Sequence, residues 1–201
     1  MREFWDERYA SKDYFYGTTP NHFLSSITGI LKKSARILCI GEGEGRNAVY
    51  LQAKGYNVTA VDFSENGKLK ALDLASQFDV KIDYQISNLE SFDFENKKWD
   101  AVISIFCHLP SSIRSDVHYR LESGLKNDGF FIFQAYNPKQ LEFKSGGPKD
   151  PEMLYTDQLI KNDFKSLQWI RLENSIEYLS EGLGHNGLSS VLTGVGVKSH
   201  I

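Results

Sequence analysis

The chain has 201 residues, of which 41% are hydrophobic and 24% charged. This is enough for one globular domain with a core and too little for two. The formal net charge is −3, and no block of five like charges occurs, which argues against electrostatic nucleic-acid binding. Cys39 and Cys107 lie in no zinc-type spacing, so neither a metal site nor a disulfide scaffold is predicted. The charged start and the lack of an 18-residue apolar run predict neither a signal peptide nor membrane contact, hence a cytoplasmic protein.

The predicted elements begin with two amphipathic helices and continue as apolar runs that alternate with helical patterns. The helices are expected over residues 4–9, 23–31, 47–54, 68–78 and 110–125, and the strands over 35–40, 57–61, 81–86, 100–106 and 130–135. In the helix over 68–78, three-residue spacing predicts a shared face for Leu69, Leu72, Ala75 and Phe78. Strands that alternate with helices predict a doubly wound, parallel α/β sheet.

The last third of the chain has a different pattern. A loop rich in glycine and proline precedes a short helix over 155–164, and two β-rich runs follow over 168–179 and 188–197. The residues between these runs are typical of a hairpin turn and are Gly182, Gly184, Asn186 and Gly187. The full prediction is an α/β fold with a doubly wound, Rossmann-like, mostly parallel seven-stranded sheet and a C-terminal antiparallel hairpin.

A glycine cluster, I-L-C-I-G-E-G-E-G-R-N at 37–47, joins the first predicted strand to a helix. In a doubly wound sheet, ligands bind beyond the carboxyl ends of the strands, where glycines let the backbone approach the ligand. Asp62 follows Gly41 by 21 residues, at the end of the second strand, where a carboxylate can accept hydrogen bonds from ribose hydroxyls. The alternative is a structural turn and a surface aspartate, but the order of elements favours nucleoside binding.

The identity of the nucleoside cofactor depends on local charge, because Gly43, Gly45 and Ala48 also fit a loose dinucleotide pattern. A dinucleotide would bring its pyrophosphate to this loop, where Glu42 and Glu44 lie. If these carboxylates point inward, two unit charges about 4 Å apart repel by roughly 4 kcal/mol. S-adenosylmethionine has an ammonium, a sulfonium and no phosphate, so it fits better. A Walker-type loop is excluded, since no Gly-Lys-Ser/Thr follows the glycines.

Seven short motifs are spread over nearly the whole chain: F-W-D-E-R-Y at 4–9, Y-G-T-T-P-N at 16–21, G-E-G-E-G-R-N at 41–47, G-Y-N-V-T-A-V-D at 55–62, S-I-F-C-H-L-P at 104–110, L-K-N-D-G at 125–129 and G-G-P-K-D at 146–150. Through these motifs the chain resembles the class I S-adenosylmethionine-dependent methyltransferases. Within them it is similar to a small bacterial group related to tellurite-resistance and thiopurine methyltransferases.

The resemblance implies roles for residues at the carboxyl ends of four strands. Gly41, Glu42 and Gly43 would wrap the methionine portion of the cofactor. Asp62 would bind the ribose hydroxyls, and Phe63 would pack on the adenine. The remaining cofactor contacts that the resemblance implies are Asn88, Leu89, Ile105 and Phe106.

Two positions depart from the family pattern. Asn88 stands where an aspartate usually accepts the adenine amino group, and its side-chain oxygen can still accept that bond. Cys39 stands where an acidic residue usually pairs with the ammonium group, which leaves Glu42 as the nearest replacement. These departures keep open a module that binds S-adenosylmethionine without catalysis.

We expect the acceptor pocket to be closed by the amino-terminal segment and by the loop over 136–155. Tyr14 and Tyr16 offer aromatic walls, and Arg46 is expected to anchor either that segment or an anionic acceptor. His108, at the end of the fourth strand, would act as a base or cap the following helix. Its neighbour Cys107 is interpreted as a packed thiol rather than a nucleophile.

One domain is predicted over 1–201, with lid helices over 1–33, a cofactor-binding core over 34–135, and an acceptor-side loop and hairpin over 136–201. So little chain remains for an acceptor site that a small molecule is the expected partner, rather than nucleic acid or membrane. A thiol or chalcogen oxyanion would attack without a base, so no catalytic residue is assigned. We therefore predict a small-molecule methyltransferase that is a monomer or a weak homodimer. A nicotinamide-dependent oxidoreductase and a non-catalytic binding module are the alternatives.

Overall fold

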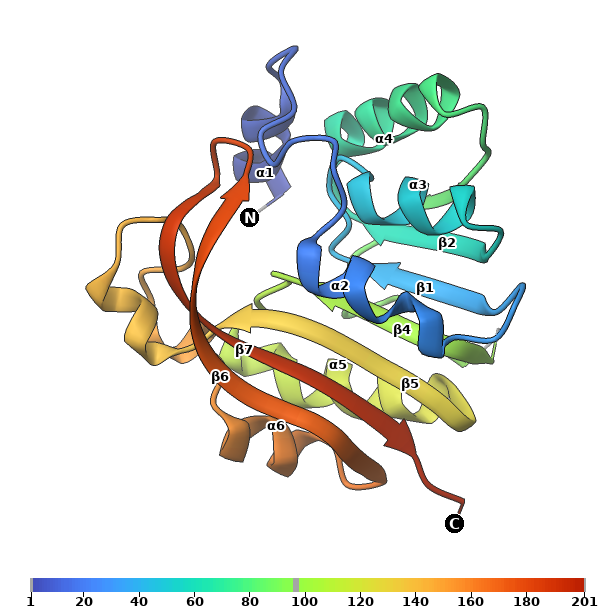
Figure 1. Cartoon of the computed structure of the whole chain (residues 1–201), viewed down its shortest axis with the longest axis vertical. Coiled ribbons are helices and arrows are strands. Elements are labelled where there is room, and N and C mark those ends of the chain that lie inside the picture. The colour runs from blue at the N-terminus through green and yellow to red at the C-terminus, as the bar shows by residue number, and fades with distance from the viewer. Residues whose placement is uncertain (1, 96–97, 201) are drawn as a thin grey trace.

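Seven strands form one sheet in the spatial order β3-β2-β1-β4-β5-β7-β6 (Figure 1). The computed structural model describes residues 2–95 and 98–200. Paired strands run parallel, except that β7 is antiparallel to both β5 and β6. The strands are β1 (Arg36–Ile40), β2 (Asn57–Asp62), β3 (Asp83–Ile86), β4 (Trp99–Ile105), β5 (Leu125–Tyr136), β6 (Leu167–Glu181) and β7 (His185–Lys198). The predicted mostly parallel sheet with a C-terminal antiparallel hairpin is confirmed.

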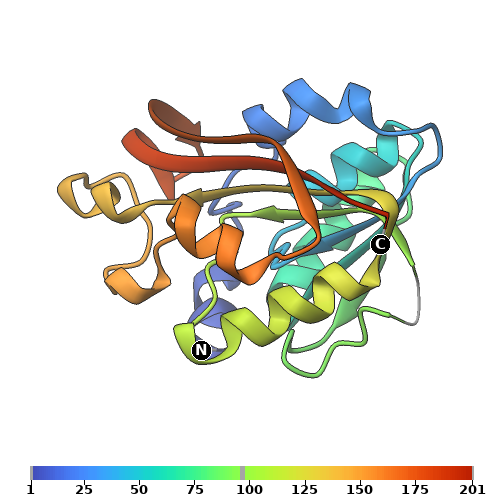
Figure 2. The ribbon, with the colours of Figure 1, turned by 90° about the horizontal axis from the view of Figure 1, so that it is seen from below.

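Helices cover both faces of the sheet (Figure 2). They are α1 (Arg2–Tyr9), α2 (His22–Ile27), α3 (Arg46–Ala53), α4 (Glu65–Gln77), α5 (Ser111–Gly124) and α6 (Asp157–Asp163), with short 3-10 helices at Thr28–Ile30, Pro138–Glu142 and Pro151–Met153. In β1, Ile37 and Cys39 pack in the core under α2, α3 and α4, whereas Leu38 and Ile40 pack against α5 and α6. Burial on both faces explains why this strand is apolar throughout its buried part. No helix in the described ranges is long and apolar enough to span a bilayer.

Helix α4 buries a different face from the one that the sequence analysis predicts. Leu69, Leu72 and Phe78 are 66%, 40% and 56% exposed. A three-residue step falls about 60° short of a full turn in a helix with about 3.6 residues per turn, so residues at that spacing drift around the axis. Mixed three- and four-residue steps keep to one side, and the buried residues are Gly67, Ala71, Leu74 and Ala75.

The turn of the C-terminal hairpin is shorter than predicted. Strand β6 continues to Glu181 and β7 begins at His185, and these two residues are paired in the sheet register. Asn186 and Gly187 therefore belong to β7 rather than to the turn. The consequence for the site is that His185 is placed by a sheet position and not by a flexible turn.

The tip of this hairpin packs against the segment between α1 and α2, which we call the amino-terminal strap (residues 10–21). The backbone N–H groups of Leu183 and Gly184 donate to the Phe15 carbonyl at 2.8 and 3.1 Å. In Figure 1 the hairpin curls toward α1 at the same end of the sheet. Segments from opposite ends of the chain thus meet over the carboxyl ends of the central strands.

Candidate active site

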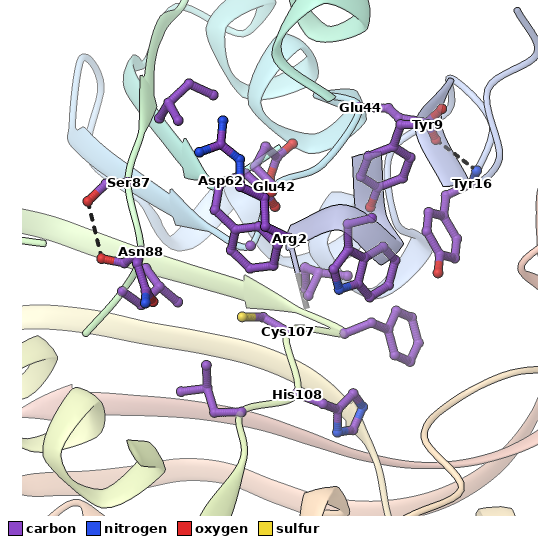
Figure 3. A pocket seen from close by; sticks show the side chains of 18 of the residues that line it. Arg2, Tyr9, Tyr16, Glu42, Glu44, Asp62, Ser87, Asn88, Cys107 and His108 are labelled. Carbon is purple, nitrogen blue, oxygen red and sulfur yellow. Dashed lines mark hydrogen bonds between the residues drawn. The ribbon is translucent and has the colours of Figure 1, made fainter. Parts of the chain in front are cut away.

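A cavity of about 480 Å³ lies at the carboxyl ends of β1, β2 and β4 (Figure 3). Strand β1 pairs with β2 on one side and β4 on the other, so the cavity lies at the switch point where open α/β sheets bind ligands. The predicted site residues that line it are Tyr16, Gly41, Glu42, Arg46, Asp62, Phe63, Asn88, Leu89, Ile105, Phe106 and His108. Residues that the sequence analysis did not assign also line it, among them Trp5, Tyr9 and His185.

At Gly41 the glycine loop brings its backbone to the floor of the cavity. Gly41 has a φ of +58°, and a Cβ there would lie 2.5 Å from the Sγ of Cys107. Burial raises the pKa of that thiol to about 12, as expected for a packed cysteine. Gly43 lies behind the cavity wall instead: its N–H donates to Asp62 Oδ2 at 3.0 Å and its carbonyl accepts from the Tyr84 hydroxyl at 2.6 Å. Gly43 therefore shapes the loop from behind.

Glu42 points back onto the first turn of α3. Its Oε1 accepts hydrogen bonds from the backbone N–H groups of Asn47 and Ala48 at 3.0 and 2.7 Å. A carboxylate thus occupies the helix N-terminus, which is where a dinucleotide would place its pyrophosphate. Burial raises the pKa of Glu42 to about 7, so a cation beside this carboxyl would be stabilising.

Asp62 is held at the end of β2 by the backbone. Its Oδ2 accepts from Gly43 N–H at 3.0 Å and its Oδ1 from Ser64 N–H at 2.9 Å. Burial raises the pKa of this carboxyl, against the effect of those hydrogen bonds. Each oxygen has further acceptor capacity toward the cavity, which suits a pair of ribose hydroxyls.

The end of the cavity predicted to hold adenine is lined by Phe63, Asn88 and Leu89. The Asn88 side chain folds back on its own loop, where Oδ1 accepts from Glu90 N–H at 3.2 Å and Nδ2 donates to Glu90 Oε2 at 2.7 Å. The Oδ1 atom has one further acceptor position for an adenine amino group.

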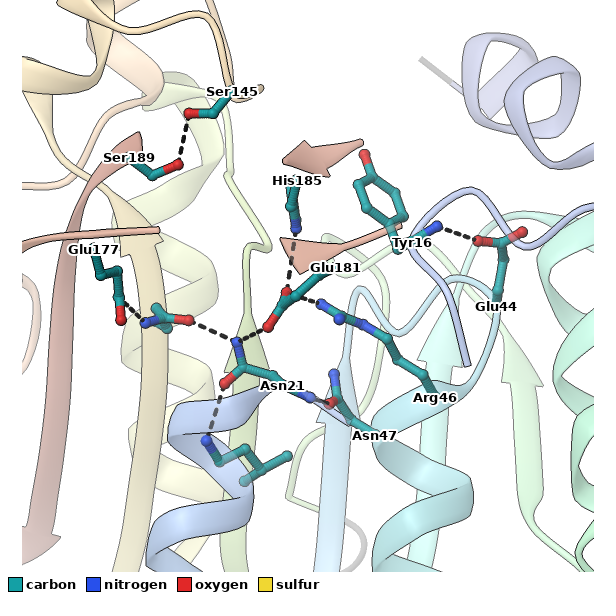
Figure 4. A network of polar contacts seen from close by, with 12 residues as sticks. Tyr16, Asn21, Glu44, Arg46, Asn47, Ser145, Glu177, Glu181, His185 and Ser189 are labelled. Carbon is teal, nitrogen blue, oxygen red and sulfur yellow. Dashed lines mark hydrogen bonds and ion pairs between the residues drawn. The ribbon is translucent and has the colours of Figure 1, made fainter. Parts of the chain in front are cut away.

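Glu44 does not act on the cofactor in the way that the sequence analysis assumes. Its Oε1 forms an ion pair with Lys70 Nζ at 2.6 Å and accepts from the backbone N–H of Phe15 at 3.0 Å. Its Oε2 accepts from the backbone N–H of Tyr16 at 3.1 Å (Figures 3 and 4). The charge of the Glu44 carboxylate is therefore balanced by Lys70, and its hydrogen bonds connect the amino-terminal strap to the glycine loop. Only Glu42 supports the charge argument against a dinucleotide.

Tyr14 lies outside the cavity lining in the described part of the chain, so the expectation that it forms an acceptor wall is corrected. Its hydroxyl donates to the Lys70 carbonyl at 3.0 Å and contacts Asp73 Oδ2 at 3.2 Å, which ties the strap to α4. Tyr16 is the strap residue that lines the cavity.

The loop over 136–155 contributes no side chain to the cavity among the described residues, which corrects a second expectation. It packs behind the wall. A Cβ at Gly147 would lie 2.7 Å from the Tyr136 ring, and one at Gly146 would lie 3.4 Å from the His185 ring. The loop therefore supports His185 from behind, and the hairpin itself closes the pocket.

His108 lines the cavity, but backbone groups occupy both of its ring nitrogens. Nδ1 lies 2.7 Å from the carbonyl of Met153, and Nε2 accepts from Tyr136 N–H at 3.1 Å. Burial lowers the pKa of the ring to about 4. The ring joins the loop after β4 to the end of β5 and to the 3-10 helix Pro151–Met153, and it neither caps α5 nor offers a free nitrogen to a substrate.

The structure brings Arg46 to two ionisable residues of the distant C-terminal hairpin, Glu181 and His185 (Figure 4). Arg46 Nη2 pairs with Glu181 Oε2 at 2.6 Å, and His185 Nδ1 lies 3.5 Å from the same oxygen. Asn21 Nδ2 donates to the other oxygen of Glu181 at 2.8 Å. The pairing of Arg46 with the hairpin, rather than with the strap alone, was not foreseen, and neither was His185.

Comparisons with known proteins agree with this geometry. Residues 37–129 match the sequence profile of a methyltransferase domain. A search of curated proteins found no match. Three solved structures share the fold at low identity. One, from work on the conversion of a disulfide bond into a thioacetal group during echinomycin biosynthesis, has a TM-score of 0.80 at 15% identity and covers 99% of this chain and 92% of its own.

The second structure is TehB from Haemophilus influenzae, with a TM-score of 0.73 at 15% identity over 98% of this chain and 67% of TehB. The third is the N-methyltransferase NodS from Bradyrhizobium japonicum WM9 in complex with S-adenosyl-L-homocysteine, with a TM-score of 0.73 at 12% identity over 99% and 98% of the two chains. Residues 37–129 thus match a methyltransferase domain, the chain has the fold of S-adenosylmethionine-dependent methyltransferases, and these matches indicate S-adenosylmethionine as the cofactor.

Proposed function

We propose that this protein transfers the methyl group of S-adenosylmethionine to a small-molecule acceptor. The observation that carries the proposal is the position of Glu42, whose carboxyl occupies the α3 N-terminus and lines the cavity. This arrangement disfavours a pyrophosphate and favours the ammonium group of an amino-acid moiety. It also weighs against the nicotinamide-dependent oxidoreductase that the glycine spacing leaves open.

The residues of the pocket fit this cofactor from end to end. The backbone at Gly41 and the Glu42 carboxyl would hold the methionine portion, Asp62 the ribose hydroxyls, and Phe63 with Leu89 the adenine. S-adenosylmethionine supplies a methyl group bonded to a positively charged sulfur, so the protein's task is to orient the acceptor, exclude water and hold charge.

The acceptor must be small, because the cofactor shares a cavity of about 480 Å³ with it. The narrower prediction of a tellurite-resistance or thiopurine type of enzyme, with a thiol or chalcogen oxyanion as acceptor, rests on sequence phrases and on the fold shared with TehB. It requires no base near the acceptor, because a thiolate or chalcogen anion attacks the methyl group unaided.

Two binding measurements and one transfer assay test the proposal. Calorimetry should detect saturable binding of S-adenosylhomocysteine, and its absence would contradict the proposal. Reduced nicotinamide should show no saturable fluorescence enhancement with the protein, whereas a saturable signal would favour the oxidoreductase. A radiolabelled-methyl screen over phenols, thiols, selenite, tellurite and thiopurines should find at least one acceptor. Cofactor binding without transfer to any of them would favour the non-catalytic binding module.

A further inference from the structure

Arg46 lines the cavity and carries an unsatisfied buried donor. The residue is 6% exposed and lines the cavity, and its Nη2 pairs with Glu181. Its Nη1 is buried without a hydrogen-bond partner in the described part of the chain. A buried donor that is left unpaired destabilises the folded protein, and a charged donor does so more than a neutral one. A ligand oxygen that accepts from Nη1 would remove that destabilisation.

Glu181 holds Arg46 and His185 at one place. Its Oε2 contacts both of them, and its Oε1 accepts from Asn21 Nδ2. Asn21 also donates to Gln134 Oε1 at 2.6 Å, so the carboxylate is fixed by groups from the strap, β5 and α3. Although burial opposes it, pairing with His185 and Arg46 lowers the pKa of Glu181 to about 2, so the carboxylate stays ionised.

The position of His185 suits proton transfer. Its Nδ1 lies 3.5 Å from Glu181 Oε2 without a hydrogen bond, and a ring that closes on this carboxylate would carry its hydrogen on Nδ1 and its lone pair on Nε2. No hydrogen bond to Nε2 occurs among the residues of the described ranges, in contrast to His108, whose two nitrogens are both bonded. The 3.5 Å contact to Glu181 is long, as is common for catalytic pairs before substrate binds.

Aromatic rings define the space beside this pair. The His185 ring centroid lies 4.5 Å from that of Tyr16 and 4.2 Å from that of Phe106. Phe106 directly follows β4, on the side of the pocket that is predicted to face the cofactor. Because His185 lies beside Phe106, it lies toward the reacting end of the pocket and not toward the adenine end. Flat apolar walls with two polar groups fit a planar aromatic ring that carries an oxygen.

We propose that Arg46, His185, Tyr16 and Phe106 form an acceptor subsite for a small phenol-type hydroxyl compound, in which His185 Nε2 takes the hydroxyl proton and Arg46 Nη1 donates to the oxygen. The inference rests on the proposed function. Glu181 is a positioning residue, because it acts through Arg46 and His185 and does not line the cavity in the described part of the chain.

The proton balance is simple. The proton of the hydroxyl group moves to His185 Nε2, and the electron pair of the O–H bond stays on the oxygen. An electron pair of this oxygen then forms the bond to the methyl carbon, while the electron pair of the carbon–sulfur bond leaves with the sulfur. The resulting imidazolium is stabilised by Glu181 and returns its proton to water. No oxidant or reductant is needed.

The charged groups around His185 set its titration. Burial lowers the pKa of His185, and the Arg46 and Arg8 guanidinium groups lower it further, while Glu181 raises it. The ring of His108 also interacts with it electrostatically. The net lowering keeps His185 neutral near pH 7, as a base must be.

The subsite is tested with 4-nitrophenol, whose phenolate absorbs visible light, on the protein saturated with S-adenosylhomocysteine. At about pH 6, where the free probe is mainly protonated, binding to the wild type should generate the phenolate signal. The bound probe should ionise at least about one pH unit below the free probe. This measurement needs no variant, so it cannot be lost to misfolding. A bound probe that ionises like the free one would overturn the proposal.

Variants then assign the effect to the two residues. His185→Gln should abolish the phenolate signal and weaken probe binding about tenfold. The double variant Arg46→Gln with Glu181→Gln removes the ion pair without leaving a lone buried charge and should weaken probe binding at least tenfold. His200→Gln, an exposed histidine at the far end of β7, is the matched control and should behave as wild type. Unchanged probe affinity in both pocket variants would overturn the assignment.

Cofactor binding separates this inference from the proposed function. His185→Gln should bind S-adenosylhomocysteine within about twofold of the wild type, which also reports that it folds, and the double variant should still bind it saturably. If the wild type binds S-adenosylhomocysteine but no 4-nitrophenol, the subsite is wrong and the proposed function stands. If the wild type binds no S-adenosylhomocysteine, the proposed function itself fails.

Discussion

Replacing Glu42 with glutamine should remove the pH dependence of cofactor affinity in the neutral range. Glutamine keeps a side-chain oxygen, so the bonds that Oε1 accepts from Asn47 and Ala48 can persist and the loop should keep its shape. Only the ionisable charge is lost. The substitution thus isolates the electrostatic role of Glu42 from its role in capping α3.

The magnitude follows from the pKa of Glu42, which burial raises to about 7. The ionised fraction of such a carboxyl rises from about one tenth at pH 6 to about three quarters at pH 7.5. If the carboxylate form alone pairs with the ammonium group, wild-type affinity for S-adenosylhomocysteine increases about eightfold over this range, or about 1.2 kcal/mol.

The same shift predicts the opposite trend for the protein without cofactor. The folded pKa of Glu42 lies above its ordinary value of 4.5, so the folded state binds the proton more tightly than the unfolded state. The contribution of this group to stability therefore falls as the pH rises from about 4.5 through 7. A bound cation lowers the pKa and reverses that loss, which links cofactor binding to proton release.

Calorimetry with S-adenosylhomocysteine at several pH values between 6 and 7.5 measures the slope, and buffers of different ionisation enthalpy measure the released proton. Glu90→Gln is the matched control, because Glu90 also lines the cavity but lies at the adenine end. A flat wild-type profile, or an equal slope in Glu42→Gln, would refute the pairing of Glu42 with the ammonium group.

Three further experiments test the loop and its supports. Asp62→Ala should weaken S-adenosylhomocysteine binding more than tenfold, about 1.4 kcal/mol or beyond, by calorimetry; unchanged affinity would mean that the ribose lies elsewhere. Gly45→Ala should lower the free energy of unfolding more than Gly55→Ala. Both glycines have positive φ, but only at Gly45 would an added Cβ meet α4, at 2.5 Å from the Cβ of Ala71. Each should lose about 1–2 kcal/mol from strain, and equal losses in denaturant titrations would contradict the close packing. Lys70→Met removes the ion pair with Glu44 and should speed proteolytic cleavage in the strap, whereas an unchanged cleavage rate would show that the pair does not hold it.

The cofactor end of the pocket is predictable from sequence because its signal is local. One strand-loop-helix-strand unit contains the glycine loop, Glu42 and Asp62, and the neighbouring residues in the sequence indicate the chemical role of each. Even here the sequence does not say where a carboxylate points. Glu42 and Glu44 are the same residue type two positions apart, yet Glu42 caps α3 whereas Glu44 binds Lys70 and the strap.

The acceptor end is not predictable in the same way, because its contacts cross the chain. Arg46 and Glu181 are 135 residues apart, and His185 enters the pocket through the register of β6 with β7. The sequence signal for His185 is a histidine among turn-forming residues, which is a weak indication on its own. A predicted hairpin whose two strands extend to a three-residue turn over 182–184 would have placed His185 opposite Glu181.

The most direct test of the account is a crystal structure of the protein with S-adenosylhomocysteine. We expect the ribose hydroxyls on Asp62, the ammonium group beside Glu42, and the sulfur toward Phe106 and His185. A nucleoside bound elsewhere, or a cofactor whose amino-acid end turns away from the glycine loop, would contradict the central claim that this loop and Asp62 form a methyl-donor site.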